Sequence, residues 1–190
     1  MAQKLRKQGF TILLDPQGDG NCQFAAVADQ LKRLNLVGKD TNVDQIKNRV
    51  IEFLERNDYL RSIYRDSRDR NLDTVIELLR RTNEYGDELT LFAISNIYGI
   101  QIIIIKAEEY GIKKDSDGNL YQPDRLVNAG GGNFSESMNT ILLGFADGGA
   151  GDAHQDAGHY FSITIDETLI PIYGRFVSLG GGILLEGKSF

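Results

Sequence analysis

The chain has 190 residues, 41% of them hydrophobic, and a formal net charge of −6 at pH 7, which indicates one globular domain and argues against nucleic acid as a partner. No apolar run approaches the length of a membrane span and the first residues lack the apolar core of a signal peptide, so we expect no membrane association. The single cysteine, Cys22, excludes an internal disulfide and favours the cytoplasm, the nucleus or, for a delivered protein, a host cytosol.

The first predicted elements are a short strand and a helix, separated by a turn. Residues 10–14 form the strand, and the turn residues 15–18 end it. From Cys22 onward apolar residues recur at helical spacing, which predicts a helix with one buried face that ends near Gly38. Cys22 is therefore expected at a junction between a turn and a helix.

Capping signals predict three more helices in the first half of the chain. Asp44 takes the place of the usual glutamate in one of these signals, which otherwise resembles a capping box. Thr41 with Asp44 is predicted to cap a helix over residues 46–54, Asp73 a helix over 75–79, and Asp87 a helix over 88–98. Gly99 suits the residue that follows a helix C-terminus.

Most predicted strands lie in the second half of the chain. The β-branched run over residues 100–105 is typical of a strand that is buried on both faces. The other predicted elements are strands over 140–145, 159–165, 169–173 and 175–179, and a hairpin over 110–121. Because helices come early and strands mainly late, we predict a single α+β domain over residues 1–190.

Cys22 is the first residue of chemical interest. At the start of a helix, the helix dipole and the free N–H groups of the first turn favour the thiolate, which is the nucleophilic form. The same N–H groups can hold an oxyanion. A lone cysteine can equally be a small buried hydrophobic residue, and the flanking turn residues leave both interpretations open.

His159 supplies a possible base for that thiol. It opens a predicted strand, and a loop over residues 146–158 that is rich in Gly, Ala and Asp leads into it. Loops of this length without their own secondary structure are often functional. A cysteine and a histidine far apart in sequence form a candidate nucleophile–base pair. His154, in the same loop, is expected to be a surface residue.

Four other patterns are expected to carry no chemistry. Residues 182–189 match a phosphate-binding loop, but the helix that such a loop requires does not follow within this sequence. Residues 115–126 lack the glycine and the final acid of a calcium loop. One cysteine and two histidines make no zinc site, so we expect no metal and no cofactor. The arginines within residues 61–81 alternate with aspartates, which indicates a solvated helix face.

Three sequence blocks together resemble one protein family. The blocks are Asp19-Gly20-Asn21-Cys22, then Tyr85-Gly86-Asp87-Glu88-Leu89, then Gly158-His159-Tyr160. Their order and spacing are similar to those of the OTU (ovarian tumour) cysteine proteases, with Tyr85 at the position of a tryptophan. The resemblance covers roughly residues 10–165, and residues 166–190 would be an extension. It implies a papain-like fold, in which a central β-sheet packs between helices.

The resemblance implies a deubiquitinase, which cleaves the bond between the C-terminal glycine of ubiquitin and a lysine or another ubiquitin. Cys22 would be the nucleophile and His159 the general base of an acyl transfer through a thioester. Asp19 and the backbone of Gly20 and Asn21 would form the loop that binds the oxyanion. Ubiquitin or polyubiquitin would be the partner of a monomeric protein.

The substrate contacts follow less directly from the resemblance. Gly158 and Tyr160 flank the histidine and are candidate substrate-binding residues. The glycines of the preceding loop would border the groove for an extended ubiquitin tail, although an ordinary mobile loop explains them as well; they are Gly148, Gly149 and Gly151. The resemblance also places part of the ubiquitin-binding surface on residues 59–81.

Phe161 departs from the pattern of the family. Many members have an acidic or amide residue two positions after the histidine, and this residue orients the imidazole. Phenylalanine cannot accept the ring N–H. The candidate replacements are Asp15, which we rank first, and then Asp19, Asn21 and Ser162. Ser162 is expected to face away from His159, because successive side chains on a strand alternate.

Two other functions remain open at this stage. One is a catalytically silent module that binds ubiquitin, which Phe161 favours and the retained Cys22 and His159 oppose. The other is a thiol hydrolase that acts on a different ubiquitin-like modifier. Only a comparison of substrates separates the second from a deubiquitinase.

Overall fold

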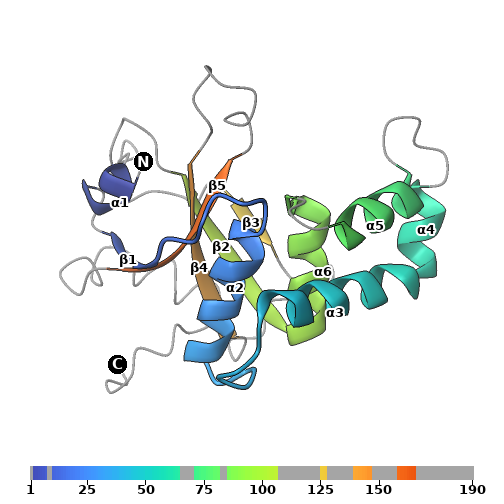
Figure 1. The fold of residues 1–190 in the computed structure, drawn as a ribbon, viewed down its shortest axis with the longest axis horizontal. Helices are drawn as coiled ribbons and strands as arrows, with labels where there is room; N and C mark the ends of the chain where they lie inside the picture. Colours follow the sequence, from blue (N-terminus) through green and yellow to red (C-terminus); the bar gives the residue numbers. More distant parts are fainter. Residues whose placement is uncertain are drawn as a thin grey trace, which may run out of the picture.

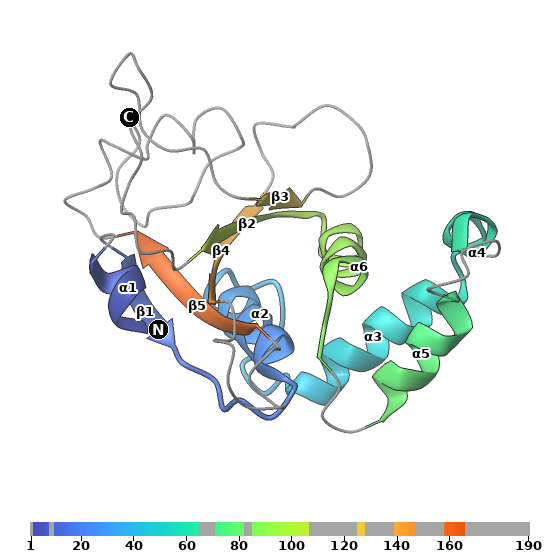
Figure 2. The same ribbon diagram turned by 90° about the horizontal axis from the view of Figure 1, so that it is seen from above.

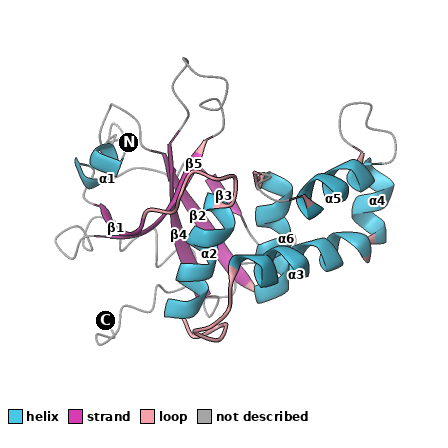
Figure 3. Cartoon of the chain, in the orientation of Figure 1, coloured by secondary structure: helices cyan, strands magenta, loops and turns pink. Residues whose placement is uncertain are grey.

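The structure, a computed structural model, describes residues 2–7, 10–64, 71–81, 85–106, 125–127, 139–146 and 158–165. Helices and strands of the described residues form an α+β arrangement, as predicted (Figures 1 and 3). The elements are α1 (Ala2–Lys7), β1 (Phe10–Leu14), α2 (Cys22–Arg33), α3 (Val43–Glu55), α4 (Asp58–Tyr64), α5 (Leu72–Arg80), α6 (Glu88–Tyr98), β2 (Ile100–Lys106), β3 (Arg125–Val127), β4 (Asn139–Ala146) and β5 (His159–Ile165).

The strands form one mixed sheet in the order β1-β5-β4-β2-β3. Strands β2 and β4 pair in parallel, and the other neighbours are antiparallel. The two parallel strands are buried along most of their length, because both faces of the sheet are covered there. This arrangement explains the continuous apolar run that predicted a doubly buried strand. Strand β5 lies between β1 and β4: its first half, from His159, pairs with β4, its second half, up to Ile165, pairs with β1, and Ser162 pairs with both.

Helices cover both faces of the sheet, which confirms the predicted central position of the sheet. Alternate residues of β2 and β4, such as Ile102 and Leu143, face the larger core together with α2, α3 and α6. The intervening residues, such as Ile103 and Leu142, face a smaller core that includes Leu5 of α1. Helices α3, α4 and α5 extend away from the sheet on the side opposite to β1 (Figures 1 and 2).

Two of the predicted helix caps are wrong by one or two residues. Helix α3 starts with a capping box of Asn42 and Gln45, in which each side chain accepts from the backbone N–H of the other. Helix α5 is capped by Asn71 and not by Asp73. Asparagine is among the strongest N-cap residues; Asn42 directly follows the predicted cap Thr41, and Asn71 stands two residues before the predicted cap Asp73.

The other helix ends follow the physical chemistry of their residues. Asp87 caps α6 by accepting from the N–H groups of Leu89 and Thr90, and Gly99 ends that helix with a φ of +59°, both as predicted. Helix α2 ends at Arg33, earlier than the predicted Gly38. A turn replaces its last part, in which the N–H of Leu36 donates to the carbonyl of Leu31 over 2.9 Å.

Helix α1 and strand β3 carry too few residues to show a hydrophobic period, and the sequence did not predict them. Several predictions lie outside the described residues. They are the hairpin over 110–121, the strands over 169–173 and 175–179, the loop residues 147–157 with Gly148, Gly149, Gly151 and His154, and the segment 182–189. No described helix is long and apolar enough to cross a membrane.

Candidate active site

Cys22 lies where the sequence placed it, as the first residue of α2 after a turn. Its side chain is buried, with 1% of its surface exposed. A backbone hydrogen bond joins the sulfur to Tyr160 of β5. Since Tyr160 directly follows His159, this contact brings the thiol to the start of the strand that carries the histidine.

The position at the helix start does not lower the pKa of the Cys22 thiol overall. Burial is the largest effect and raises this pKa above its usual value, and the nearby Asp19 carboxylate raises it further. Backbone hydrogen bonds from Tyr160 and Gln23 lower it by less. The N–H groups at the helix start do lower the pKa of the Cys22 thiol, as predicted, but burial outweighs them, because a buried thiolate loses more hydration than the N–H groups replace.

The raised pKa predicts slow alkylation of Cys22 in the isolated protein. At neutral pH the protonated thiol dominates, so alkylation by a haloacetamide should be slower than for free cysteine and should rise until the pH exceeds the usual thiol range. Because the chain has one cysteine, mass spectrometry of the whole protein reports this rate directly. A midpoint below that of free cysteine would show that the helix start dominates after all.

His159 is the first residue of β5, and its ring is held on two sides. The Nε2 atom lies 3.0 Å from Oδ1 of Asp15, the residue that follows β1. The edge-on contact with Phe161 has a ring-centroid distance of 4.5 Å and an interplanar angle of 79°. Phe161 therefore packs against the imidazole and Asp15 supplies the hydrogen-bonding oxygen. With Nε2 facing Asp15, Nδ1 is the nitrogen left to exchange a proton with a thiol.

A β-bulge in β1 places Asp15 on the same side of the sheet as His159. Ile12 pairs with Ile163, but Leu14 pairs with Ser162, so β1 holds one extra residue between them. Without this residue the alternation would turn Asp15 to the opposite face. The bulge is a tertiary feature, and no turn or glycine signal in residues 10–14 announces it.

The loop before Cys22 is held in a tight turn. Gly20 has a φ of +88°, which favours glycine over residues with a side chain. The N–H of Asn21 donates to Oδ1 of Asp19 over 2.9 Å. In this conformation the Asn21 N–H donates to Asp19, and the N–H groups of Cys22 and Gln23 lie at the sulfur together with that of Tyr160.

Lys47 supports this loop from α3, although the sequence patterns did not predict a role for it. Its Nζ atom is 3.3 Å from Oδ1 of Asn21 and 3.2 Å from the carbonyl oxygen of Arg81, so it donates to both. The side chain is buried and lies over the ring of Phe24. A signal was present, because Lys47 precedes Val50 by one helical turn and so shares the apolar face of α3.

The block that begins at Tyr85 braces the first turn of α2. The buried Gln23 side chain donates to the carbonyl oxygen of Asp87 over 3.2 Å and accepts from the Thr90 hydroxyl over 2.6 Å. Gly86 leaves room for that amide, since a Cβ atom there would lie 1.9 Å from Oε1 of Gln23. The middle block of the sequence pattern therefore fixes the residue next to Cys22, while Tyr85 itself is exposed.

Replacing Gly86 with alanine is expected to push the Gln23 amide out of its bonds and lower the free energy of unfolding by about 1–3 kcal/mol. Urea unfolding measures the loss. In the double variant Gly86→Ala/Gln23→Ala the clash is gone, so the two losses should be less than additive. Additive losses would contradict the proposed contact.

The remaining predicted residues have mainly structural contacts. The Tyr160 ring packs on Phe145 with a centroid distance of 4.8 Å, and Gly158 directly precedes β5. The Ser162 hydroxyl bonds to residues of α2, which is the side opposite to His159, as the strand alternation predicts. Within the described part of the chain, no group of three or more His, Cys, Asp or Glu side chains is arranged to hold a metal ion.

Known proteins resemble this chain in sequence and in fold. The family model "OTU-like cysteine protease" matches residues 17–126. The OVARIAN TUMOR DOMAIN-containing deubiquitinating enzyme 9 of Arabidopsis thaliana is 29% identical over 89 residues, which make up 47% of this chain and 24% of that enzyme. The aligned segment is thus about a quarter of the length of the relative.

Two solved structures share the fold. The OTU domain of OTUD1 has a TM-score of 0.55 at 13% identity, covering 85% of this chain and 90% of that domain. An OTU deubiquitinase from Wolbachia pipientis wMel, in its structure bound to ubiquitin, has a TM-score of 0.52 at 15% identity, covering 83% of this chain and 97% of that one. Since the family model matches more than half of its length, this chain belongs to the OTU-like cysteine proteases.

Proposed function

We propose that this chain is a thiol-dependent deubiquitinase, which hydrolyses peptide and isopeptide bonds at the C-terminal glycine of ubiquitin. The observation that carries the proposal is the constellation of Cys22, His159 and Asp15 at the meeting point of α2, β5 and β1. A buried thiol beside a histidine strand, with that histidine bonded to a carboxylate, has the parts of a nucleophile, a base and an orienting group.

In the first half of the reaction, Nδ1 of His159 accepts the proton of the Cys22 thiol while the sulfur attacks the carbonyl carbon of the ubiquitin C-terminal glycine. The N–H groups of Cys22 and Gln23, which lie at the sulfur, are the proposed donors to the negative oxygen of the tetrahedral intermediate. The C–N bond then breaks, and the leaving amine takes the proton from the imidazolium. A thioester between Cys22 and ubiquitin remains.

In the second half, a water molecule attacks the thioester and His159 accepts one of its protons. The carbon–sulfur bond breaks, ubiquitin leaves as a free acid, and the sulfur recovers its proton from the imidazolium. The raised pKa of Cys22 makes the base essential, because the resting thiol must lose its proton as the attack takes place. Asp15 stabilises the imidazolium formed in both halves.

Ubiquitin is the proposed partner on the basis of relatives. The Wolbachia pipientis wMel enzyme and a further OTU domain of the same fold have structures bound to ubiquitin, and the Arabidopsis thaliana relative is a deubiquitinating enzyme. These likenesses support the substrate class. Hydrolysis of di-ubiquitins of each linkage would determine which ubiquitin linkage the chain cleaves.

Replacing Asp15 with alanine is expected to lower kcat by about 10- to 100-fold and to leave ubiquitin binding intact. The loss should be smaller than for a buried acid, because 56% of the Asp15 side chain is exposed and water can partly replace it. Asp15→Asn is the matched control, since its amide oxygen still accepts from Nε2 and retains part of the activity. Unchanged kcat in Asp15→Ala would remove Asp15 from the site.

A silent module that binds ubiquitin is the second candidate, and the burial of Cys22 favours it. With 1% of its surface exposed and a raised pKa, the thiol has the properties of a structural cysteine as well as those of a resting nucleophile. The bonded pair of His159 and Asp15 favours the enzyme, because a silent site has no need to orient an imidazole.

A ubiquitin probe with a C-terminal electrophile tests the proposal. Wild type should form a covalent adduct and Cys22→Ala should not, and di-ubiquitins of each linkage would then define the substrate. Binding of the probe without an adduct would favour the silent module. If the ubiquitin probe neither bound nor formed an adduct, and a probe made from another ubiquitin-like protein did react, the chain would be a hydrolase for that other modifier.

A further inference from the structure

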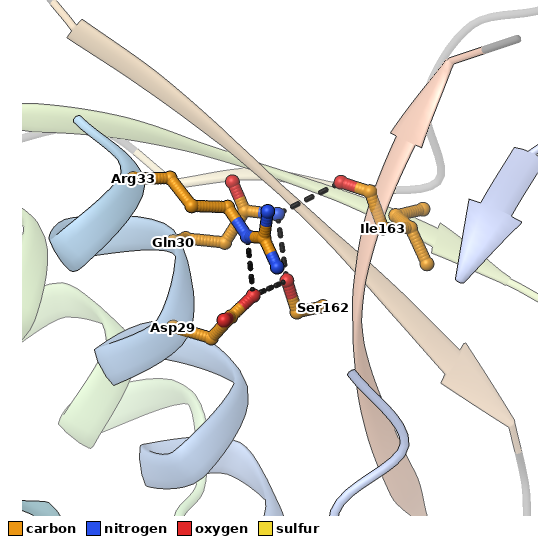
Figure 4. A network of polar contacts seen from close by, with 5 residues as sticks. All are labelled: Asp29, Gln30, Arg33, Ser162 and Ile163. Atoms are coloured by element: carbon orange, nitrogen blue, oxygen red, sulfur yellow. Dashed lines mark hydrogen bonds and ion pairs between the residues drawn. The ribbon is translucent and has the colours of Figure 1, made fainter. Parts of the chain in front are cut away.

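A polar network joins the helix of the nucleophile to the strand of the base (Figure 4). The Nε2 atom of Gln30 donates to the Ser162 hydroxyl over 3.0 Å and to the carbonyl oxygen of Ile163 over 2.8 Å. The Ser162 hydroxyl in turn donates to Oδ2 of Asp29 over 2.6 Å. Arg33 donates to the same carboxylate oxygen over 2.8 Å from the outer side.

The inner part of this network is enclosed by the protein. Ser162 has no exposed surface and Gln30 is buried, while Asp29 lies at the edge of the core. The Ser162 oxygen accepts one hydrogen bond and donates another, so each bond fixes the direction of the next. An apolar contact at this place would bury the surface equally well, but it would allow α2 to slide along β5.

Ser162 is also a meeting point of the backbone elements around the site. It lies three residues after His159 on β5, and its backbone pairs with Leu14 on one side and Leu143 on the other. Leu14 directly precedes Asp15. On the helix side, Asp29 and Gln30 lie two turns after Cys22 on α2. Ser162 thus joins the segments that carry all three residues of the proposed site: its hydroxyl bonds to α2, and its backbone pairs with β1.

We propose that Ser162, held by Asp29 and Gln30, is a positioning residue that sets the placement of Cys22 relative to His159. We call these three residues the Ser162 clamp. The expected effect on kcat rests on the proposed function, whereas the placement of α2 against β5 does not depend on it. The clamp keeps the Cys22 sulfur within reach of the Tyr160 amide and of the imidazole beside it.

Replacing Ser162 with alanine is expected to lower kcat by about 10- to 100-fold, with KM changed less than about two-fold, because the ubiquitin surface is untouched and only the alignment of reacting groups is loosened. The variant should fold, since Gln30 keeps its bond to Ile163 and Asp29 keeps Arg33. Thr164→Ala is the matched control: it removes a hydroxyl from the same strand and the same face, outside the clamp, and should keep wild-type kcat.

Variants of Asp29 provide a second route if Ser162→Ala unfolds. Asp29→Asn keeps an oxygen that accepts from the Ser162 hydroxyl and should retain most of the activity, whereas Asp29→Ala should lower kcat as Ser162→Ala does. Arg33→Ala removes only the outer ion pair with Asp29. Because 47% of the Arg33 side chain is exposed, kcat of this variant should stay close to that of wild type. Equal kcat values for Asp29→Ala, Asp29→Asn and wild type would overturn the clamp.

Alkylation of Cys22 separates the clamp from the proposed function. At a fixed pH, Ser162→Ala should be alkylated about two- to ten-fold faster than wild type, because loosening α2 against β5 exposes the buried thiol and this gain outweighs the loss of the Tyr160 donor, and Thr164→Ala should not. If wild type cleaves no ubiquitin conjugate but the alkylation rates differ in this way, the proposed function fails and the clamp stands. Equal alkylation rates, or equal kcat losses in Ser162→Ala and Thr164→Ala, would overturn the clamp.

Discussion

Replacing Cys22 with alanine is expected to lower the hydrolysis of ubiquitin conjugates by about 10⁴- to 10⁶-fold, to the background of the assay. The chain has no other thiol, so no neighbouring sulfur can take over the attack. The measurement is single-turnover hydrolysis of a fluorogenic ubiquitin substrate, with mass spectrometry to detect the thioester. The thioester should be present in wild type and absent in the variant.

Binding of ubiquitin should survive the same substitution. The Cys22 side chain is buried, so its loss removes one sulfur from the core and changes the free energy of unfolding by roughly 1 kcal/mol. Titration with ubiquitin and a thermal unfolding curve provide the controls. Hydrolysis that persists in a folded Cys22→Ala variant would rule out thiol catalysis, and with it the proposed mechanism.

Replacing His159 with alanine is expected to lower kcat by about 10²- to 10⁴-fold, the range for loss of a general base. The effect should be large because burial keeps Cys22 protonated, so the thiol depends on the imidazole to remove its proton. Raising the pH should recover part of the rate in the variant, since hydroxide then forms the thiolate that the base no longer produces. Rates from neutral to alkaline pH measure this recovery.

The second histidine provides a matched control for this experiment. The chain has only two histidines, and His154→Ala should retain wild-type kcat. Imidazole added to His159→Ala should restore part of the activity, because the missing ring leaves a space beside Phe161 and Asp15 that a small base can enter. If His154→Ala were the inactive variant, the base would have been assigned to the wrong residue.

Local signals in the sequence were strong wherever one segment alone decides the structure. Asp87 and Gly99 fix the two ends of α6, and the isoleucine run of β2 follows from burial on both faces. Competing caps were harder to rank, because Asn42 and Asn71 stand next to other residues that can also cap a helix. Short elements such as β3 form only through pairing with a neighbour and so lack a period of their own.

The sequence by itself determined the two ends of the candidate site. It placed Cys22 at a turn-to-helix junction and His159 at the start of a strand, because glycines, turn residues and hydrophobic periods act over a few neighbouring residues. The sequence also contains the three family blocks. The second block, which begins at Tyr85, holds the Gln23 side chain next to Cys22 through hydrogen bonds with Asp87 and Thr90.

Only the tertiary structure decided how these parts meet. The bulge in β1 turns Asp15 toward His159, and Ser162 joins β5 to α2, through contacts between residues far apart in the chain. The protonation state of Cys22 was also decided there, since burial by the assembled core outweighs the local N–H groups of its own helix. Strand register and desolvation depend on the whole fold, and no local stretch of sequence specifies them.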